Sequence, residues 1–259
     1  MSGETLHIIK IGGAVIENPE MKQAFLDGFV GLEGKKILVH GGGRIATEIG
    51  ERLGLKTQMV EGRRVTDDAT IDLVTMVYGG LVNKQMIAQL QSLGVNAIGL
   101  TGADASIITS QKRPVKNGVD YGWVGDPQKV NDQFLVSLLT AGSIPVIAPL
   151  THDGQGHILN TNADTMAGTL AVAMAEHFDV NLILTFELDG VMQDVNDPNS
   201  LMVNFQESFF KEMKSTGAIH SGMIPKLENA FKALNSGVKT VRICKYDQIH
   251  TKNGSFLQV

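Results

Sequence analysis

The feature that most constrains this chain is an alternation of short apolar runs with longer amphipathic segments. The apolar runs have strand length and are continuous, as in strands that are buried on both faces. The segments between them carry apolar residues at helical spacing. This alternation predicts an α/β fold, with a mainly parallel central sheet sandwiched between helices. The expected strands are Leu6–Ile11, Lys36–His40, Asn96–Leu100, Ile144–Pro149, Val180–Phe186 and Thr240–Cys244, and the expected helices are Pro19–Leu32, Ile45–Leu53, Ala69–Leu93, Asp132–Thr140, Ala163–Phe178, Phe209–Lys214 and Ile224–Leu234.

The composition suits a large buried core and excludes several classes of protein. The chain has 259 residues, 43% of them hydrophobic, and a formal net charge of −5 without a basic stripe, which argues against a nucleic-acid partner. It has neither an apolar run long enough to span a membrane nor the pattern of a signal peptide. The single cysteine, Cys244, excludes a disulfide framework, and its apolar strand favours packing over a nucleophilic role. We therefore expect a cytosolic globular protein.

Two glycine-containing polar stretches interrupt the strand–helix alternation. They are VKNGVDYGW, with Asn117-Gly118, and THDGQGHIL, with Asp153-Gly154, and both have the turn residues of β-hairpins. We expect these hairpins to be insertions over a substrate site. His152 and His157 fall in the second stretch, but the pattern indicates a glycine-rich turn rather than a metal site.

The first apolar run contains a lysine and ends on two glycines, in HIIKIGG. The glycines allow a ligand to approach the backbone amides, and ligands of open α/β sheets bind at the C-terminal ends of the strands. Lys10 lies near such an end. It is either a group that faces a ligand or a strand-end lysine whose ammonium reaches water.

A glycine turn, Gly41-Gly42-Gly43, closes the second run and opens a helix. Bare amides at a helix N-terminus favour an anion. Residues 41–46, GGGRIA, also match the dinucleotide fingerprint G-x-G-x-x-A, with Glu61 near the position of a ribose-binding acid. That oxidoreductase alternative is the weaker one, because the fingerprint usually closes the first strand of its unit.

Three further polar groups converge on the helix starts. In GRRVTD, Arg63 and Arg64 could hold a carboxylate through the planar fork of a guanidinium, or could belong to a charged surface turn. In NTNAD, Asn162 is a good helix cap and Asp164 suits the helix dipole, whereas Asn160 has no such structural explanation.

The last group is GMIPK, where Pro225 suits a first helical turn. Lys226 opposes the helix dipole there, as expected if it neutralises a bound anion. The chain contains neither a Walker A motif nor a G-x-S-x-G elbow.

Taken together, these pieces resemble the amino acid kinase family. The matching stretches are IIKIGG, VHGGG, GRRVTD, GLTGADAS, VGDPQKVN, LNTNAD and GMIPK, in the family order and over nearly the whole chain. The resemblance implies one kinase domain over residues 1–259, with an N-terminal lobe (about 1–172) that binds an acylated amino acid and a C-terminal lobe (about 173–259) that binds ATP. It implies transfer of the γ-phosphoryl of ATP to a side-chain carboxylate, with Mg²⁺ held mainly by the nucleotide.

The resemblance also assigns roles to residues. Lys10 and Lys226 would neutralise the transferring phosphoryl, and Asp164 would orient both lysines. Amides of Gly13 and Gly42 would donate to the transferring group. The acylated substrate would be held by Arg64, by Asn160 and by the amides of Gly42 and Gly43. The nucleotide would be held by Glu187, Leu188, Asp189, Gly190, Ser221, Gly222 and Met223.

Some positions depart from the family pattern. Phe186-Glu187 stands where Thr-Asp is usual, and Ser221 stands where Gly or Asp is common. The resemblance favours an N-acetylated glutamate as acceptor, in arginine biosynthesis, but the residues leave succinyl or another acyl group open. A non-catalytic metabolite sensor is a further alternative. The few residues before Lys10 match relatives that form homodimers and are not inhibited by arginine.

Overall fold

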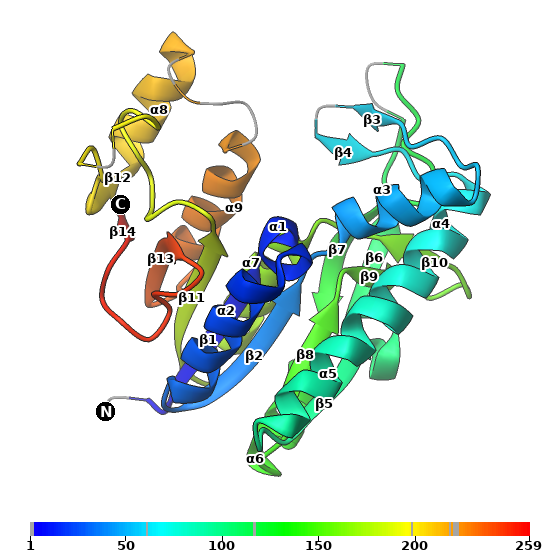
Figure 1. The fold of residues 1–259 in the computed structure, drawn as a ribbon, viewed down its shortest axis with the longest axis horizontal. Helices are drawn as coiled ribbons and strands as arrows, with labels where there is room; N and C mark the ends of the chain where they lie inside the picture. The colour runs from blue at the N-terminus through cyan, green and yellow to red at the C-terminus, as the bar shows by residue number, and fades with distance from the viewer. Residues whose placement is uncertain (1–2, 61, 116–117, 198, 218, 220–222) are drawn as a thin grey trace. The chain divides into compact units, whose positions relative to one another are not determined.

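The computed structural model describes residues 3–60, 62–115, 118–197, 199–217, 219 and 223–259. Its packing divides the chain into two compact units, residues 1–36 with 167–259 and residues 37–166. The central strands of each unit are parallel to one another and are flanked by helices, which confirms the predicted α/β fold class (Figure 1). The sequence predicts that residues 1–172 bind the acylated amino acid and that residues 173–259 bind ATP. This division of the ligand sites stays a prediction. Among the described helices, none combines the length and apolarity needed to cross a membrane.

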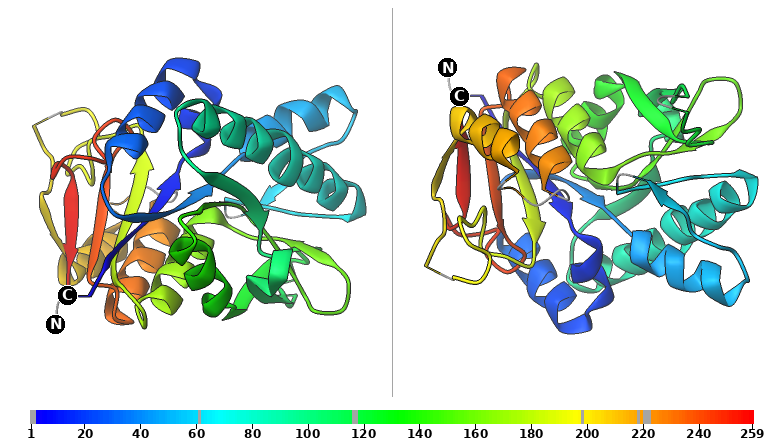
Figure 2. Two further views of the ribbon diagram at one scale, coloured as in Figure 1. Left: turned by 90° about the horizontal axis from the view of Figure 1, so that it is seen from below. Right: turned by 90° about the horizontal axis from the view of Figure 1, so that it is seen from above.

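The first unit is built on strands in the order β12-β14-β13-β11-β1. β1 and β11 are parallel, as are β11 and β13, whereas β14 runs antiparallel to β13. Both views of Figure 2 place α2 (blue) and α9 (orange) on opposite faces of these strands. The strands are β1 (Thr5–Ile11), β11 (Asp179–Phe186), β12 (Asn204–Gln206), β13 (Thr240–Lys245) and β14 (Ser255–Gln258), and the helices are α1 (Gly13–Glu17), α2 (Pro19–Gly31), α7 (Ala163–Met174), α8 (Glu207–Thr216) and α9 (Ile224–Asn235).

The second unit contains parallel strands in the order β2-β8-β5 and an antiparallel-rich group in the order β10-β9-β6-β7. A two-stranded β3-β4 ribbon completes it. The strands are β2 (Lys35–His40), β3 (Met59–Val60), β4 (Arg63–Arg64), β5 (Ala97–Thr101), β6 (Ile108–Lys112), β7 (Gly125–Val130), β8 (Ile144–Ala148), β9 (Leu150–His152) and β10 (Ile158–Asn160), and the helices are α3 (Gly43–Arg52), α4 (Asp68–Val74), η1 (Thr75–Val82), α5 (Asn83–Ser92), η2 (Asp104–Ser106) and α6 (Asp132–Thr140).

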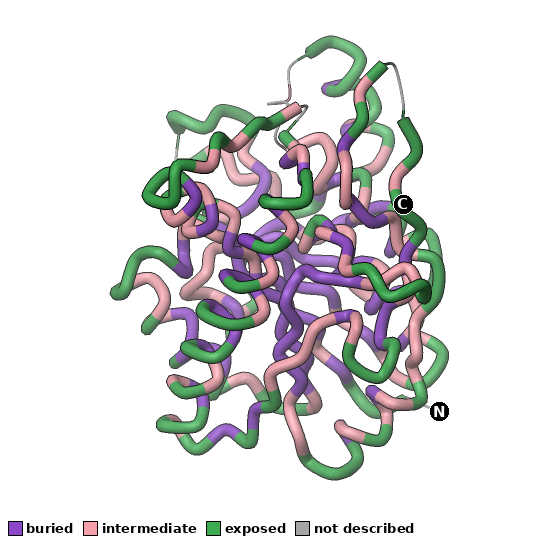
Figure 3. Tube along the Cα trace, turned by 90° about the vertical axis from the view of Figure 1, so that its right-hand side faces the viewer, coloured by how far each residue is buried: buried purple, intermediate pink, exposed green. Residues whose placement is uncertain are grey.

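Each unit buries its apolar runs as the sequence predicts. Most residues of β1, β2, β8, β11 and β13 are buried, and buried residues are drawn purple along the trace in Figure 3. Leu6, Ile8, Ile9 and Ile11 of β1 are fully buried, and Cys244 is a buried free thiol whose pKa burial raises to about 11. That environment confirms a packing role for the cysteine, since a nucleophilic thiol needs a lowered pKa.

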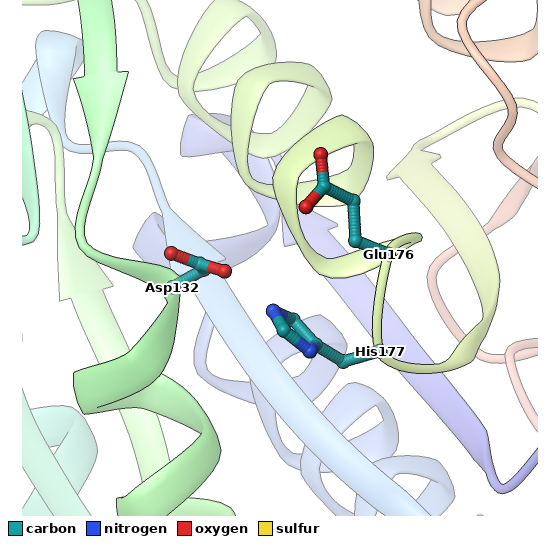
Figure 4. Close-up of side chains that lie close together, drawn as sticks. All are labelled: Asp132, Glu176 and His177. Carbon is teal, nitrogen blue, oxygen red and sulfur yellow. The ribbon is translucent and has the colours of Figure 1, made fainter.

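Polar residues define the helix starts. The Asn18 side chain accepts the amides of Glu20 and Met21 at the start of α2, and Asn131 accepts the amide of Phe134 in α6. Figure 4 shows Asp132, the acidic first residue of α6, and also Glu176 and His177, which follow the end of α7. Capping and an acidic first turn stabilise a helix N-terminus, so these boundaries agree with the sequence pattern.

The long helix expected over residues 69–93 is present, but its middle is not α-helical. It consists of α4, the π-helical segment η1 and α5 in one continuous run. A π-helix has a wider i→i+5 bonding pattern and is frequent at functional sites. Tyr78 of η1 and Asn83 of α5 both pack against the segment that contains the glycine turn.

Both expected hairpin regions contain paired strands. β9 and β10 pair around the turn at residues 153–157, with His152 opposite Ile158. β6 and β7 also pair, with Lys112 opposite Gly125, so a longer connection joins them than the sequence suggested. Asn117 of the predicted Asn117-Gly118 turn lies outside the described residues.

Candidate functional site

The second unit contains a solvent-open cavity of about 670 Å³. Four residues predicted to bind the acylated substrate line it together: Gly42, Gly43, Arg64 and Asn160. The remaining lining residues are Gly41, Met59, Gly62, Arg63, Tyr78, Val124, Pro149, Thr161, Asn162 and Ala163. The structure therefore brings the glycine turn, GRRVTD and NTNAD, which are far apart in the chain, to one cavity.

A buried histidine supports the glycine turn. His40 ends β2 and is fully buried; its Nδ1 lies 2.7 Å from the Gly41 carbonyl oxygen and its Nε2 lies 3.1 Å from Nδ2 of Asn83. Burial lowers the pKa of His40 to about 4, so the ring is neutral at pH 7. Nδ1–H therefore donates to Gly41 and Nε2 accepts from Asn83. These two bonds fix the orientation of the first peptide in the turn.

The turn also depends on the absence of a side chain at Gly42. A Cβ at this position would lie 2.9 Å from Cδ1 and 3.1 Å from Cε1 of Tyr78. Helix α3 then begins at Gly43, and no side chain caps its N-terminus in the part of the chain that the structure describes. Uncapped amides at the start of a helix can bind an anion. The glycine turn can thus present backbone donors to the cavity.

Arg64 is held in one position by three hydrogen bonds. Its guanidinium donates to the carbonyl oxygen of Gly43 at 2.7 Å, and to the hydroxyl oxygens of Thr47 and Thr57 at 2.8 Å each. Its residue exposure is 8%. Burial raises the pKa of the neighbouring Tyr78, and the Arg64 charge opposes that rise. A guanidinium fixed in this way can bind a carboxylate without losing further conformational freedom.

Asn160 is held by hydrogen bonds to Thr66 and Trp123. Its Nδ2 donates to the Thr66 hydroxyl at 3.0 Å, and its backbone amide donates to the Trp123 carbonyl at 2.8 Å. The Trp123 amide in turn donates to the Thr66 carbonyl at 2.6 Å. Trp123 and Thr66 support the site but were not predicted from the sequence: Trp123 contributes through its backbone, and Thr66 contributes through its hydroxyl and its carbonyl.

The first residues of α7, up to Met166, belong to the second unit, and Ala163 lines the same cavity. Asn162 accepts the Thr165 amide at 2.9 Å, which confirms Asn162 as the helix cap. Asp164, predicted to orient the two lysines, lies in the first turn and is 7% exposed. A carboxylate at a helix N-terminus is stabilised by the helix dipole.

In the first unit, Lys10 lies at the end of β1 and is 6% exposed. It is opposite Leu184 in the β1–β11 pair, and its carbonyl oxygen accepts the Thr185 hydroxyl at 3.0 Å. A Cβ at Gly12 would lie 3.3 Å from the Thr185 carbonyl oxygen, so the glycine permits close approach of the two strand ends. Gly13 follows as the first residue of α1.

A second cavity, of about 780 Å³, lies in the first unit and is mostly apolar. Leu188, Gly190 and Met223, three residues predicted to bind nucleotide, line it. The other lining residues are Phe186, Val191, Met192, Gln193, Asp194, Val195, Met213 and Ile219.

The remaining predicted nucleotide residues are placed as follows. Glu187 is exposed, and Asp189 Oδ1 lies 3.5 Å from Nε2 of Gln248. Ser221 and Gly222 lie outside the described residues. Their roles stay predictions.

Lys226 lies in the first turn of α9, directly after Pro225, as the sequence indicated. Its Nζ is 5.4 Å from the ring centroid of Phe186, which ends β11 and is 7% exposed. The distance is that of a cation–π contact. The structure therefore places Lys226, one of the two predicted lysines, next to Phe186, a residue at which the sequence departs from the family pattern.

Comparison with known proteins establishes the family. The model of the amino acid kinase family matches residues 5–245, and the chain belongs to that family. It is 56% identical over 246 residues to the acetylglutamate kinase of Cytophaga hutchinsonii, covering 95% of this chain and 93% of that protein. It is 38% identical over 256 residues to the acetylglutamate kinase of Methanopyrus kandleri, covering 98% of this chain and all of that protein.

Solved structures share the fold. The smu.665 protein of Streptococcus mutans superposes with a TM-score of 0.80 at 28% identity, and 98% of each chain is covered. An N-acetylglutamate synthase of Neisseria gonorrhoeae, solved with coenzyme A and N-acetyl-glutamate, gives a TM-score of 0.82 at 22% identity. The match covers all of this chain and 60% of the synthase, and it shows the fold alone.

Proposed function

We propose that this chain transfers the γ-phosphoryl of ATP to the side-chain carboxylate of N-acetyl-L-glutamate, forming N-acetyl-L-glutamyl 5-phosphate in arginine biosynthesis. The observation that carries this proposal is its similarity over nearly the full length, at up to 56% identity, to enzymes named acetylglutamate kinase. The cavity of the second unit supports it, because it combines a fixed guanidinium with backbone and amide donors.

The acceptor is held by the second unit. Arg64 pairs with its α-carboxylate, since the guanidinium is already fixed by Gly43, Thr47 and Thr57. Asn160 and the amides of Gly42 and Gly43 bind its remaining polar groups. The π-helical segment supports this arrangement by placing the Tyr78 ring against Gly42.

The transfer step needs charge neutralisation rather than a general base. A carboxylate oxygen of the acceptor attacks the γ-phosphorus, and the bond from that phosphorus to the β–γ bridging oxygen breaks to release ADP. Two anionic reactants must meet, so we assign Lys10 and Lys226 to the transferring group and Asp164 to the orientation of both lysines. Amides of Gly13 and Gly42 donate to the same group.

We assign ATP to the apolar cavity of the first unit, whose lining includes Leu188, Gly190 and Met223 as proposed walls for the base. Glu187, Asp189, Ser221 and Gly222 complete the proposed nucleotide set. The described lining of the two cavities includes a single carboxylate, that of Asp194, so Mg²⁺ is carried mainly by the nucleotide. Bound together with ATP, the ion would neutralise part of the phosphate charge.

The two cavities support a single kinase domain with two ligand lobes, residues 1–172 for the acylated amino acid and 173–259 for ATP. We further propose a homodimer in the cytoplasm, where ATP is supplied. Exposed apolar side chains support the dimer: Met76 and Leu81 on η1, and Ile98 on β5, which ends its strand group. Sedimentation equilibrium would test the dimer.

A succinylated glutamate is the alternative acceptor. Arg63 lines the cavity beside Arg64 and could bind an additional carboxylate. The deciding measurement is ATP turnover with Mg²⁺ on N-acetyl-L-glutamate, N-succinyl-L-glutamate and L-glutamate, with the acyl phosphate trapped by hydroxylamine. The Lys226→Ala variant is the matched control for background hydrolysis.

The outcomes separate the candidates. Hydroxamate from acetylglutamate is the expected result. A clear preference for succinylglutamate keeps the mechanism and changes the substrate. No hydroxamate from any acceptor would contradict the kinase assignment and favour a metabolite sensor.

A further inference from the structure

Phe186 connects the apolar cavity of the first unit with Lys226. The residue ends β11, is 7% exposed and lines the cavity of about 780 Å³. The Nζ of Lys226 lies 5.4 Å from the centroid of the same ring. One aromatic side chain therefore contacts both the proposed nucleotide cavity and a cation proposed to act on the phosphoryl group.

The position of Lys226 explains why such a contact would matter. The side chain lies in the first turn of α9, where the helix dipole disfavours a cation. The residues of α9 are all described, and none in its first turn is acidic. The face of an aromatic ring carries negative charge density and attracts an ammonium, more strongly when the pair is shielded from water. Lysine is also a flexible side chain that loses conformational freedom when it is fixed in one place.

We propose that Phe186 is a positioning residue for Lys226: its ring face holds the ammonium in place to act on the transferring phosphoryl, while the same ring forms a wall of the nucleotide cavity. The inference rests on the proposed kinase function. The Phe186 ring contacts the Lys226 ammonium and also forms part of the cavity wall. Binding of the base and placement of the ammonium are therefore coupled through this one side chain.

The two properties can be separated because a cation–π contact depends on the charge distribution of the ring, whereas a cavity wall depends on its shape. Substituting 4-fluoro-, 3,5-difluoro- and 3,4,5-trifluorophenylalanine at position 186 weakens the negative face stepwise with little change in size. We expect kcat for acyl-glutamate phosphorylation to fall stepwise, by about tenfold over the series, with the KM for ATP changing less than about twofold.

The matched control is the same series at Phe210. This residue is also a buried phenylalanine of the first unit, and its ring stacks on Phe231 at 5.5 Å. Fluorination there should leave kcat unchanged. Substitutions with standard amino acids give a second test. Phe186→Leu should lower kcat as the trifluoro ring does, whereas Phe186→Tyr should keep kcat near the wild-type value.

A spectroscopic readout tests the contact without turnover. The ε-methylene protons of Lys226 should show an upfield ring-current shift that is lost in Phe186→Leu and kept in Phe186→Tyr. A kcat that is flat across the fluorinated series in an active enzyme would overturn the role of Phe186 and leave the kinase function standing. A wild-type protein that phosphorylates none of the acyl-glutamates would overturn the kinase function itself, and with it this role in phosphoryl transfer.

Discussion

The imidazole of His40 and the side-chain amide of Asn83 are hydrogen bonded at 3.1 Å, although 43 residues separate them in the chain. Asn83 also donates to the Val146 carbonyl at 3.0 Å, so it joins the end of β2 to the middle of β8. Both side chains are buried, and the histidine can accept this bond only while its ring is neutral. The pair therefore makes the support of the glycine turn sensitive to acid.

Acid should destabilise the protein through His40. Its pKa is about 4 in the folded chain and 6.5 ordinarily, so between these values the unfolded chain binds a proton that the folded chain does not. The free energy of unfolding should fall by up to about 3 kcal/mol as the pH falls through this window, and the contribution is fully present above it. Urea denaturation at a series of pH values measures the loss.

The control for this prediction is His40→Asn, which keeps an amide donor for the Gly41 carbonyl. Burial also lowers the pKa of His7, whose contribution is present in both proteins. The variant should therefore lose less stability on acidification than the wild type. Equal losses would exclude His40 as the source.

Replacing Arg64 by lysine should weaken acceptor binding. A lysine has no planar fork, so it cannot bond Gly43, Thr47 and Thr57 while pairing with a carboxylate. We expect the KM for the acylated glutamate to rise about 10- to 100-fold with kcat changing far less. Steady-state kinetics measure both, and Arg52→Lys, at the exposed end of α3, serves as the control. A fall in kcat at constant KM would place Arg64 in the transfer step instead.

The Lys10→Arg variant should lose turnover. The lysine is 6% exposed, and Gly12 packs close to the Thr185 carbonyl, so a bulky fork cannot take the place of a compact ammonium. We expect kcat to fall by about 100-fold or more, and the KM for ATP to change less. Lys211→Arg, exposed on α8, controls for the substitution itself. Full turnover in Lys10→Arg would remove Lys10 from the mechanism.

Alanine substitutions at two glycines should distinguish the cost of backbone strain from the cost of a steric clash. Gly122 and Gly118 have similar positive φ values of 69° and 75°, but a Cβ would lie 2.2 Å from the Thr66 carbonyl oxygen at Gly122 and would meet nothing within 4 Å at Gly118. Gly118→Ala should cost about 1 kcal/mol of unfolding free energy, from strain alone. Gly122→Ala should cost about 3 kcal/mol or more, and should raise the acceptor KM because Thr66 bonds Asn160. If the backbone near Gly122 moved to relieve the clash, denaturation would show the same loss of unfolding free energy in both variants. Kinetics would then show no rise in the acceptor KM of Gly122→Ala.

Trp123 should report acceptor binding by fluorescence. It is the single tryptophan of the chain, and its backbone bonds both Thr66 and Asn160. Its ring is stacked on His157 at 4.9 Å, so its emission is sensitive to small shifts. Titration with acyl-glutamate should change the emission with saturation, and Arg64→Lys should move the midpoint to higher concentration. An emission that is unchanged at saturating acceptor would show that Trp123 does not sense the site.

The elements that the sequence predicted are those with an apolar face of their own. The helix expected over Asp132–Thr140 has the same bounds in the structure, and β1, β2 and β11 differ from expectation by about a residue. β7 was missed because Pro127 and its polar neighbours form no apolar run; it becomes a strand by pairing with β6. The π-helical segment η1 was missed because its residues fit an α-helical period equally well.

The sequence by itself determined the fold class, the glycine turn, the helix caps and the family, because each depends on local residue type and order. Only the tertiary structure decided which polar groups share a cavity and what holds them there. His40 is neutral because the fold buries it, Arg64 is fixed because Thr47 and Thr57 lie within reach, and Lys226 meets Phe186 because β11 ends beside α9. Burial and contact between distant residues arise only when the chain is packed, so no local pattern could specify them.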